Sequence, residues 1–195
     1  MGSAWPSSCR SVRRIVEDAS WAEVDWVQHL WAGLLVGSCS VGNPDESNLP
    51  FIHLLSQLAT AHARIFTAAC SRAKKFMSAT GEISARPLSC SADEMMRIAG
   101  SHDLIKIDRD LEHLADLGLL ARRFKFKFFS LIDDADITPT QLGLQLFARC
   151  HGHQGLVENF YDLDSADKAN VPNRHEVFRR MRSPEWMGAM SVHIL

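Results

Sequence analysis

The chain has 195 residues, of which 46% are hydrophobic and 23% charged, and a formal net charge of −2. This composition is typical of a globular protein with a buried core, and the near-neutral charge excludes a protein that coats nucleic acid through bulk positive charge. No stretch of about 20 apolar residues predicts a membrane span, and no apolar segment follows the N-terminal arginines as in a secretory signal. Five widely spaced cysteines without a Cys-x-x-Cys motif favour a reducing cytoplasm over a disulfide framework.

The first half of the chain predicts two helices after a flexible arm at residues 1–19. Ser20 and Glu23 have the spacing of a capping box, and an apolar stripe follows at helical intervals until about Gly37. A loop rich in Ser, Gly, Asn and Asp comes next. Pro50 suits the first turn of a second helix, whose stripe extends toward Phe76. Residues 78–89 interrupt that pattern with a glycine and a proline.

Two closely spaced helices are predicted next. Ser91 and Glu94 form a second capping box, and Gly100 ends the short helix that it opens. Ser101 is expected to cap the following helix, which Gly118 ends. Because so few residues separate the two helices, the pair predicts a helix-turn-helix.

A β-hairpin and a last helix are predicted after Gly118. Basic and aromatic residues alternate within residues 119–132, which indicates a strand. Residues 133–136 are interpreted as a turn, and Ile137 and Thr138 as a short return strand. Thr138 is expected to cap a helix with Pro139 at its first position, and this helix ends at Gly152.

Together these elements predict a mainly α-helical protein. Its N-terminal helices lead into a winged-helix-like domain with a small β-hairpin. We expect a single helical domain at residues 20–152, with the winged-helix-like part at 50–152 and a C-terminal extension at 153–195.

A winged helix raises the possibility of nucleic-acid or partner contact through basic side chains. The candidate residues for such contact are Arg122, Arg123, Lys125, Lys127, Lys106 and Arg109. The helix predicted at residues 101–117 has five acidic and two basic residues, a net charge of −3 that disfavours approach to phosphates. Alternatively, the basic side chains between residues 122 and 127 only keep a strand face soluble. Nucleic-acid binding is therefore possible but not favoured.

The residues suited to metal or enzyme chemistry form no recognisable motif. Cys150, His151 and His153 lack the second close pair of ligands that a structural zinc site requires. Asp133, Asp134 and Asp136 lack the glycine and distal glutamate of a calcium loop. No cysteine or histidine lies in a known nucleophile signature. We expect no metal, no cofactor and no catalytic residue, although a Cys–His site assembled by the fold remains an alternative.

Two sequence runs resemble the middle of the Abi-alpha (abortive-infection alpha) family. They are residues 30–35, Leu-Trp-Ala-Gly-Leu-Leu, and residues 51–58, Phe-Ile-His-Leu-Leu-Ser-Gln-Leu, which Ala59 follows where the family usually has Ser. Residues 111–119 and 137–150 are similar to the C-terminal, winged-helix-like part of that family, so the resemblance covers about residues 20–152.

The resemblance implies a role in bacterial defence against phage and brings no catalytic residues with it. We therefore expect a non-enzymatic, cytoplasmic bacterial protein that acts through protein contacts, with a protein partner or by self-association, and not at a membrane. The alternative is a winged-helix transcription regulator that binds DNA.

Overall fold

The computed structural model describes residues 8–20, 25–38, 48–78, 81–121, 134–161 and 163. Within them the chain is mainly helical, with two small antiparallel sheets. The α-helices are α1 (Ser8–Ser20), α2 (Asp25–Ser38), α3 (Leu49–Ser56), α4 (Thr60–Arg72), α5 (Ala92–Ala99), α6 (Leu104–Asp116) and α7 (Gln141–Cys150), and a 3₁₀ helix, η2, spans Val157–Asn159. The strands are β1 (Lys75–Met77), β2 (Ile83–Ala85), β3 (Ser89–Ser91) and β4 (Asp134–Asp136).

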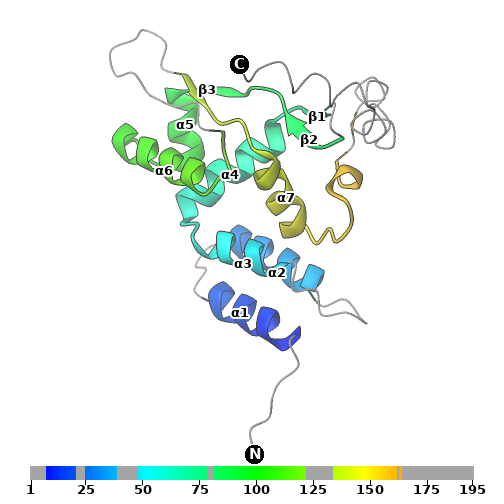
Figure 1. Cartoon of the computed structure of the whole chain (residues 1–195). Helices are drawn as coiled ribbons and strands as arrows, with labels where there is room; N and C mark the ends of the chain where they lie inside the picture. The colour runs from blue at the N-terminus through cyan, green and yellow to red at the C-terminus, as the bar shows by residue number, and fades with distance from the viewer. Residues whose placement is uncertain are drawn as a thin grey trace, which may run out of the picture.

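The helices form two groups that share one core (Figure 1). Helices α1, α2 and α3 contact one another at one end of the molecule, and α4 to α7 lie with the strands at the other. Helix α2 joins the groups by packing against α7. Strand β1 pairs with β2, and β3 pairs with β4.

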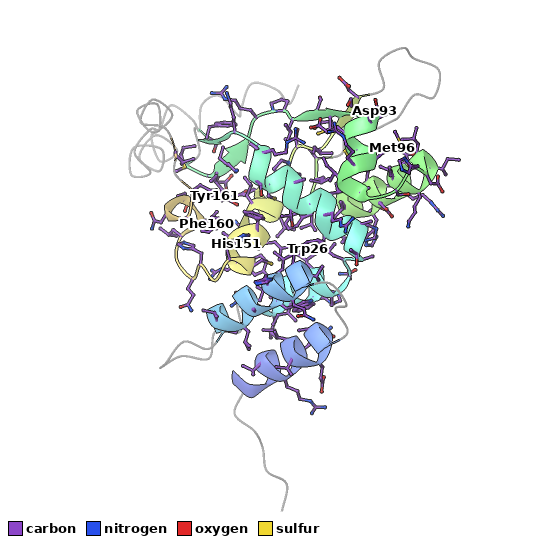
Figure 2. All side chains as sticks on the ribbon, turned by 180° about the vertical axis from the view of Figure 1, so that it is seen from behind. Trp26, Asp93, Met96, His151, Phe160 and Tyr161 are labelled. Atoms are coloured by element: carbon purple, nitrogen blue, oxygen red, sulfur yellow. The ribbon has the colours of Figure 1, made fainter. Side chains whose placement is uncertain are left out.

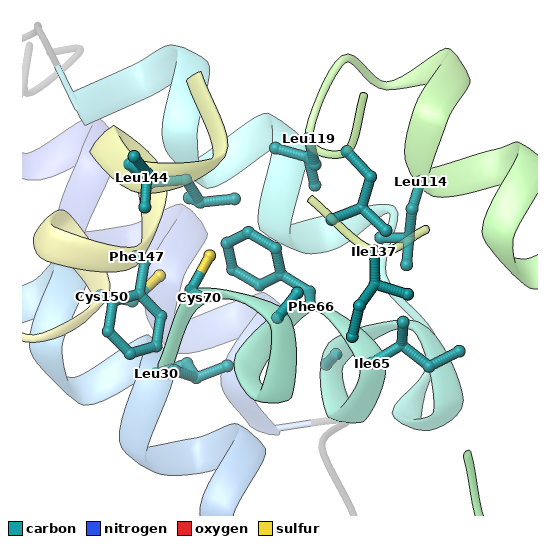
Figure 3. Packing of buried hydrophobic residues seen from close by; sticks show 14 of the residues in the cluster. Leu30, Ile65, Phe66, Cys70, Leu114, Leu119, Ile137, Leu144, Phe147 and Cys150 are labelled. Atoms are coloured by element: carbon teal, nitrogen blue, oxygen red, sulfur yellow. The ribbon is translucent and has the colours of Figure 1, made fainter. Parts of the chain in front are cut away.

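The core lies where α4 and α7 meet the other helices, as Figure 3 shows. Phe66 and Cys70 on α4 are fully buried, as are Leu144 on α7 and Leu114 on α6. The Phe66 ring contacts the Phe147 ring edge-on, with centroids 6.3 Å apart. The apolar stripes that predicted the helices therefore meet in a single cluster.

Local signals explain how α5 and α6 begin and end. The Ser91 side chain accepts a hydrogen bond from the Glu94 amide, and Gly100 ends α5 in the left-handed conformation with φ of 68°, as the sequence predicts. The prediction that Ser101 caps α6 is wrong. Asp103 is the cap, because its carboxylate accepts from the Ile105 and Lys106 amides at 3.0 and 3.1 Å.

The chain turns after α6, and the segment at residues 138–139 later pairs with the segment at residues 120–121. Gly118 has φ of 73°, and the Leu119 amide donates to the Leu114 carbonyl at 3.0 Å, as expected for a glycine that ends a helix. Leu120 forms an antiparallel bridge with Pro139, and the Ala121 amide donates to the Thr138 carbonyl. The predicted strand beyond Ala121 lies outside the described residues.

The structure corrects two predictions about the N-terminal half. Residues 8–20 form helix α1 instead of an arm, because Ile15 is buried and Arg13 pairs with Glu17 one turn later. The helix predicted from Pro50 toward Phe76 is broken into α3 and α4. The Ser56 and Gln57 side chains bond to the His53 carbonyl, and the Gln57 and Leu58 amides donate to Leu54 and Leu55 in a tighter turn that ends α3.

Strand pairing accounts for two further corrections, and a capping hydrogen bond for a third. The β1–β2 hairpin occupies the end of the predicted second helix and the predicted break, with Phe76 opposite Ser84. Residues 134–136 form β4 instead of a turn, because Ala135 pairs with Cys90 of β3. Thr140, and not Thr138, caps α7 by accepting from the Gly143 amide at 3.0 Å, so Pro139 precedes the helix.

The packed region continues past the boundary predicted at residue 152. The Tyr161 hydroxyl donates to the Leu144 carbonyl at 2.8 Å, and Leu163 is buried. Phe160 contacts the rings of Phe147 and His151 beside α7 (Figure 2). At least residues 157–161 and 163 therefore belong to the same packed unit as α7.

Candidate functional site

Helix α6 presents the two described residues of the predicted contact site. Lys106 and Arg109 are exposed, and Ile105 beside them is 63% exposed. The other four candidates, at residues 122, 123, 125 and 127, lie outside the described residues. The structure therefore brings Lys106 and Arg109 together on α6.

The exposed face of α6 remains acidic. Asp103 caps the helix, while Glu112 and Asp116 are exposed and Asp108 is half-buried. Asp110, in contrast, faces the interior, where its side chain is 13% exposed. Two basic residues thus stand among four outward acidic ones, an arrangement that repels phosphate groups.

A polar cluster joins α6 to the start of α4. The His62 Nε2 lies 3.1 Å from the Asp110 Oδ1, and both side chains are largely buried. The His113 ring contacts the His62 ring with centroids 4.6 Å apart and the ring planes tilted by 35°. Asp110 Oδ2 is buried without a hydrogen-bond partner among the described residues. Sequence analysis did not identify this cluster.

Both ring nitrogens of His62 are engaged. Nδ1 accepts from the Ala59 amide at 3.1 Å, so Nε2 carries the proton of the neutral ring and donates it to Asp110. Burial lowers the pKa of His62, and the nearby Asp110 carboxylate opposes that effect. A histidine held in this way has no free nitrogen with which to accept a substrate proton. Its role in the resting structure is to cap α4 and hold α6.

The three described thiols are buried and protonated at neutral pH. Burial raises the pKa of Cys70 and of Cys150. Burial and the Glu94 carboxylate raise the pKa of Cys90 to about 11, although the Arg72 guanidinium lies 3.7 Å from its sulfur. Because the thiolate is the reactive form, these positions do not favour a nucleophile.

The side chains of Cys150, His151 and His153 do not converge on a common site in the structure. Cys150 points into the core, His151 Nδ1 bonds to the Phe147 carbonyl at 2.7 Å, and His153 Nε2 bonds to the Leu156 carbonyl at 2.8 Å. Across the part of the chain that the structure describes, no three His, Cys, Asp or Glu side chains converge as metal ligands. Asp134 and Asp136 lie on β4, while Asp133 is not described.

A hollow of about 290 Å³ lies between the β1–β2 hairpin and the start of α7. None of the described residues that line it is charged. The lining residues are Ser84, Ala85, Pro87, Ala121, Thr138, Pro139, Thr140 and Gln141. Hydroxyl, amide and small apolar groups offer hydrogen bonds to a ligand but no acid or base for catalysis.

Every helix in the described ranges is too short or too polar to cross a membrane.

The fold and these sites define a mainly helical protein in which the described residues form no metal-binding cluster and the described cysteines are buried. The family model for abortive infection alpha matches residues 6–150, from before α1 to the end of α7. The chain therefore belongs to the abortive infection alpha family, and the match includes α1, which the resemblance seen in the sequence left out. No curated protein and no solved structure matches the chain significantly.

Proposed function

We propose that this protein acts in abortive infection, the bacterial defence against phage after which its family is named. We propose further that it is a cytoplasmic, non-enzymatic protein that works through protein contacts. Family membership supports the defence role. The acidic exposed face of α6 is the observation that favours protein over nucleic acid as the partner.

The order of elements supports a winged-helix-like module within this proposal. Strand β3 precedes α5 and α6, and β4 returns to pair with β3 before α7 begins. The bridge between Leu120 and Pro139 brings the chain after α6 beside the returning segment. This order of elements supports the predicted helix-turn-helix and wing. Fold alone does not select a function for such a module.

A DNA-binding regulator is the alternative, because four basic residues lie between Ala121 and Asp134. Duplex-DNA binding, measured by fluorescence anisotropy at two salt concentrations, separates the two functions. We expect no salt-sensitive binding by the wild-type protein. Binding that falls steeply with salt, and that is lost after Arg122, Arg123, Lys125 and Lys127 are all changed to Ser, would establish the regulator instead.

A phage-challenge assay tests the defence role itself. Bacteria that express the protein should form fewer plaques than bacteria with an empty vector. The quadruple serine variant should protect as well as wild type if protein contacts elsewhere carry the function. Equal plaque numbers with and without the wild-type protein, across a broad phage panel, would contradict the proposed role.

A further inference from the structure

The link between α3 and α4 is held to α6 by two histidines. The linker comprises residues 57–59, and its last residue, Ala59, has extended backbone angles. His113 Nε2 donates to the Gln57 carbonyl at 3.2 Å, while His62 Nδ1 accepts from the Ala59 amide at 3.1 Å. Each end of the linker is thus bonded to one imidazole of the same pair of contacting rings.

The bond to Ala59 exists only while His62 is neutral. Protonation places a hydrogen on Nδ1, and this hydrogen points at the Ala59 N–H, so that two donors oppose each other. The protonated ring must therefore leave the amide. The first turn of α4 then loses the side-chain partner that its N-terminus uses.

Asp110 favours the protonated state of His62. Its carboxylate already accepts from His62 Nε2, and its second oxygen is buried with no hydrogen-bond partner in the described region. A positively charged His62 gains a stronger interaction with this carboxylate. His113 and Lys106 oppose the added charge, as does burial of the ring. Neutral His62 therefore keeps the bond to the Ala59 amide, whereas protonated His62 loses that bond and forms an ion pair with Asp110.

We propose that the α3–α4 linker is an acid-sensitive joint: at neutral pH His62 holds its Ala59 end and His113 holds its Gln57 end, and binding of a proton to His62 releases the Ala59 end while the His113 bond to Gln57 remains. The release is local, because the packing of α2 against α7 does not involve the linker. It changes how α3 meets α4 without removing the shared core.

The chemical shift of the Ala59 amide is sensitive to its hydrogen bond with His62 Nδ1. In an NMR titration of the full chain from pH 8 to pH 5, we expect the Ala59 amide shift to move with a midpoint below 6.5, together with the imidazole nitrogens of His62. An Ala59 amide shift that stays constant while His62 titrates would overturn the proposal, as would a His62 ring that titrates at its ordinary value without affecting its neighbours.

Amide hydrogen exchange tests the release itself. His62→Gln keeps an acceptor at the third position of α4, as in a capping box, but does not titrate. The exchange rate of the Ala63 amide in wild type, divided by the rate in His62→Gln at the same pH, should be near one at pH 7.5. The ratio should rise by up to about tenfold at pH 5.5. This upper limit applies because pH 5.5 is about one unit below 6.5, the ordinary pKa of a histidine released into water. A ratio that stays at one would refute the release.

Two further variants make the result specific. Asp110→Asn removes the charge that stabilises protonated His62, so the midpoint of the Ala59 shift should move to lower pH. His102→Gln changes an exposed histidine at the start of α6 and should leave the midpoint unchanged. A midpoint shift in His102→Gln as large as that in Asp110→Asn would show that general charge, and not the His62–Asp110 contact, controls the joint.

Discussion

At Gly33, helix α2 lies against the backbone of α7. A Cβ at this position would stand 1.8 Å from the Cys150 carbonyl oxygen, whereas one at Gly37 would meet no atom closer than 3.4 Å. We expect Gly33→Ala to lower the free energy of unfolding by about 1–3 kcal/mol, because two helix backbones must separate. Gly37→Ala in the same helix should be neutral or slightly stabilising, since alanine favours helix. Urea unfolding of both variants measures the difference, and equal stabilities would contradict the close α2–α7 contact.

At the scale of the element, the start of α7 depends on one hydroxyl. Thr140 Oγ1 accepts from the Gly143 amide and donates to the Gly118 carbonyl, so it both caps α7 and fastens the turn after α6. Thr140→Ala should cost about 1–2 kcal/mol, and Thr140→Ser should recover most of that loss because it keeps the hydroxyl. Thermal unfolding compares the two. If serine is as damaging as alanine, methyl packing and not the hydrogen bonds makes the contribution.

At the scale of the whole molecule, the packed unit extends beyond the family match. Tyr161 and Leu163 are buried, the Tyr161 hydroxyl donates to the Leu144 carbonyl of α7, and burial raises the pKa of that hydroxyl. A chain ending at residue 152 should melt at a lower temperature than one ending at residue 163, because it exposes the apolar surface under the lost segment. Calorimetry of the two chains, with Tyr161→Phe to isolate the single hydrogen bond, tests this. Identical melting temperatures would make residues 153–163 dispensable for folding.

Local physics determined much of this protein from its sequence alone. Ser91 and Gly100 bound α5, and Gly118 ends the turn after α6, because each acts through backbone groups only a few residues away. The apolar stripes of α2 and α7 likewise predicted helices that bury those faces. The family resemblance rested on the same short-range features, and the family match confirms it.

Only the tertiary structure decided the pairings between distant residues. Ala135 lies in a strand because Cys90 supplies its partner, and nothing near residue 135 in sequence indicates that pairing. From its sequence position, Asp110 would add charge to an exposed helix face. In the structure its side chain is instead largely buried and bonds to His62, 48 residues earlier. Short-range patterns describe how a segment folds against itself. Contacts across the core determine which side chains lose water and meet a partner, and these contacts created the α4–α6 cluster.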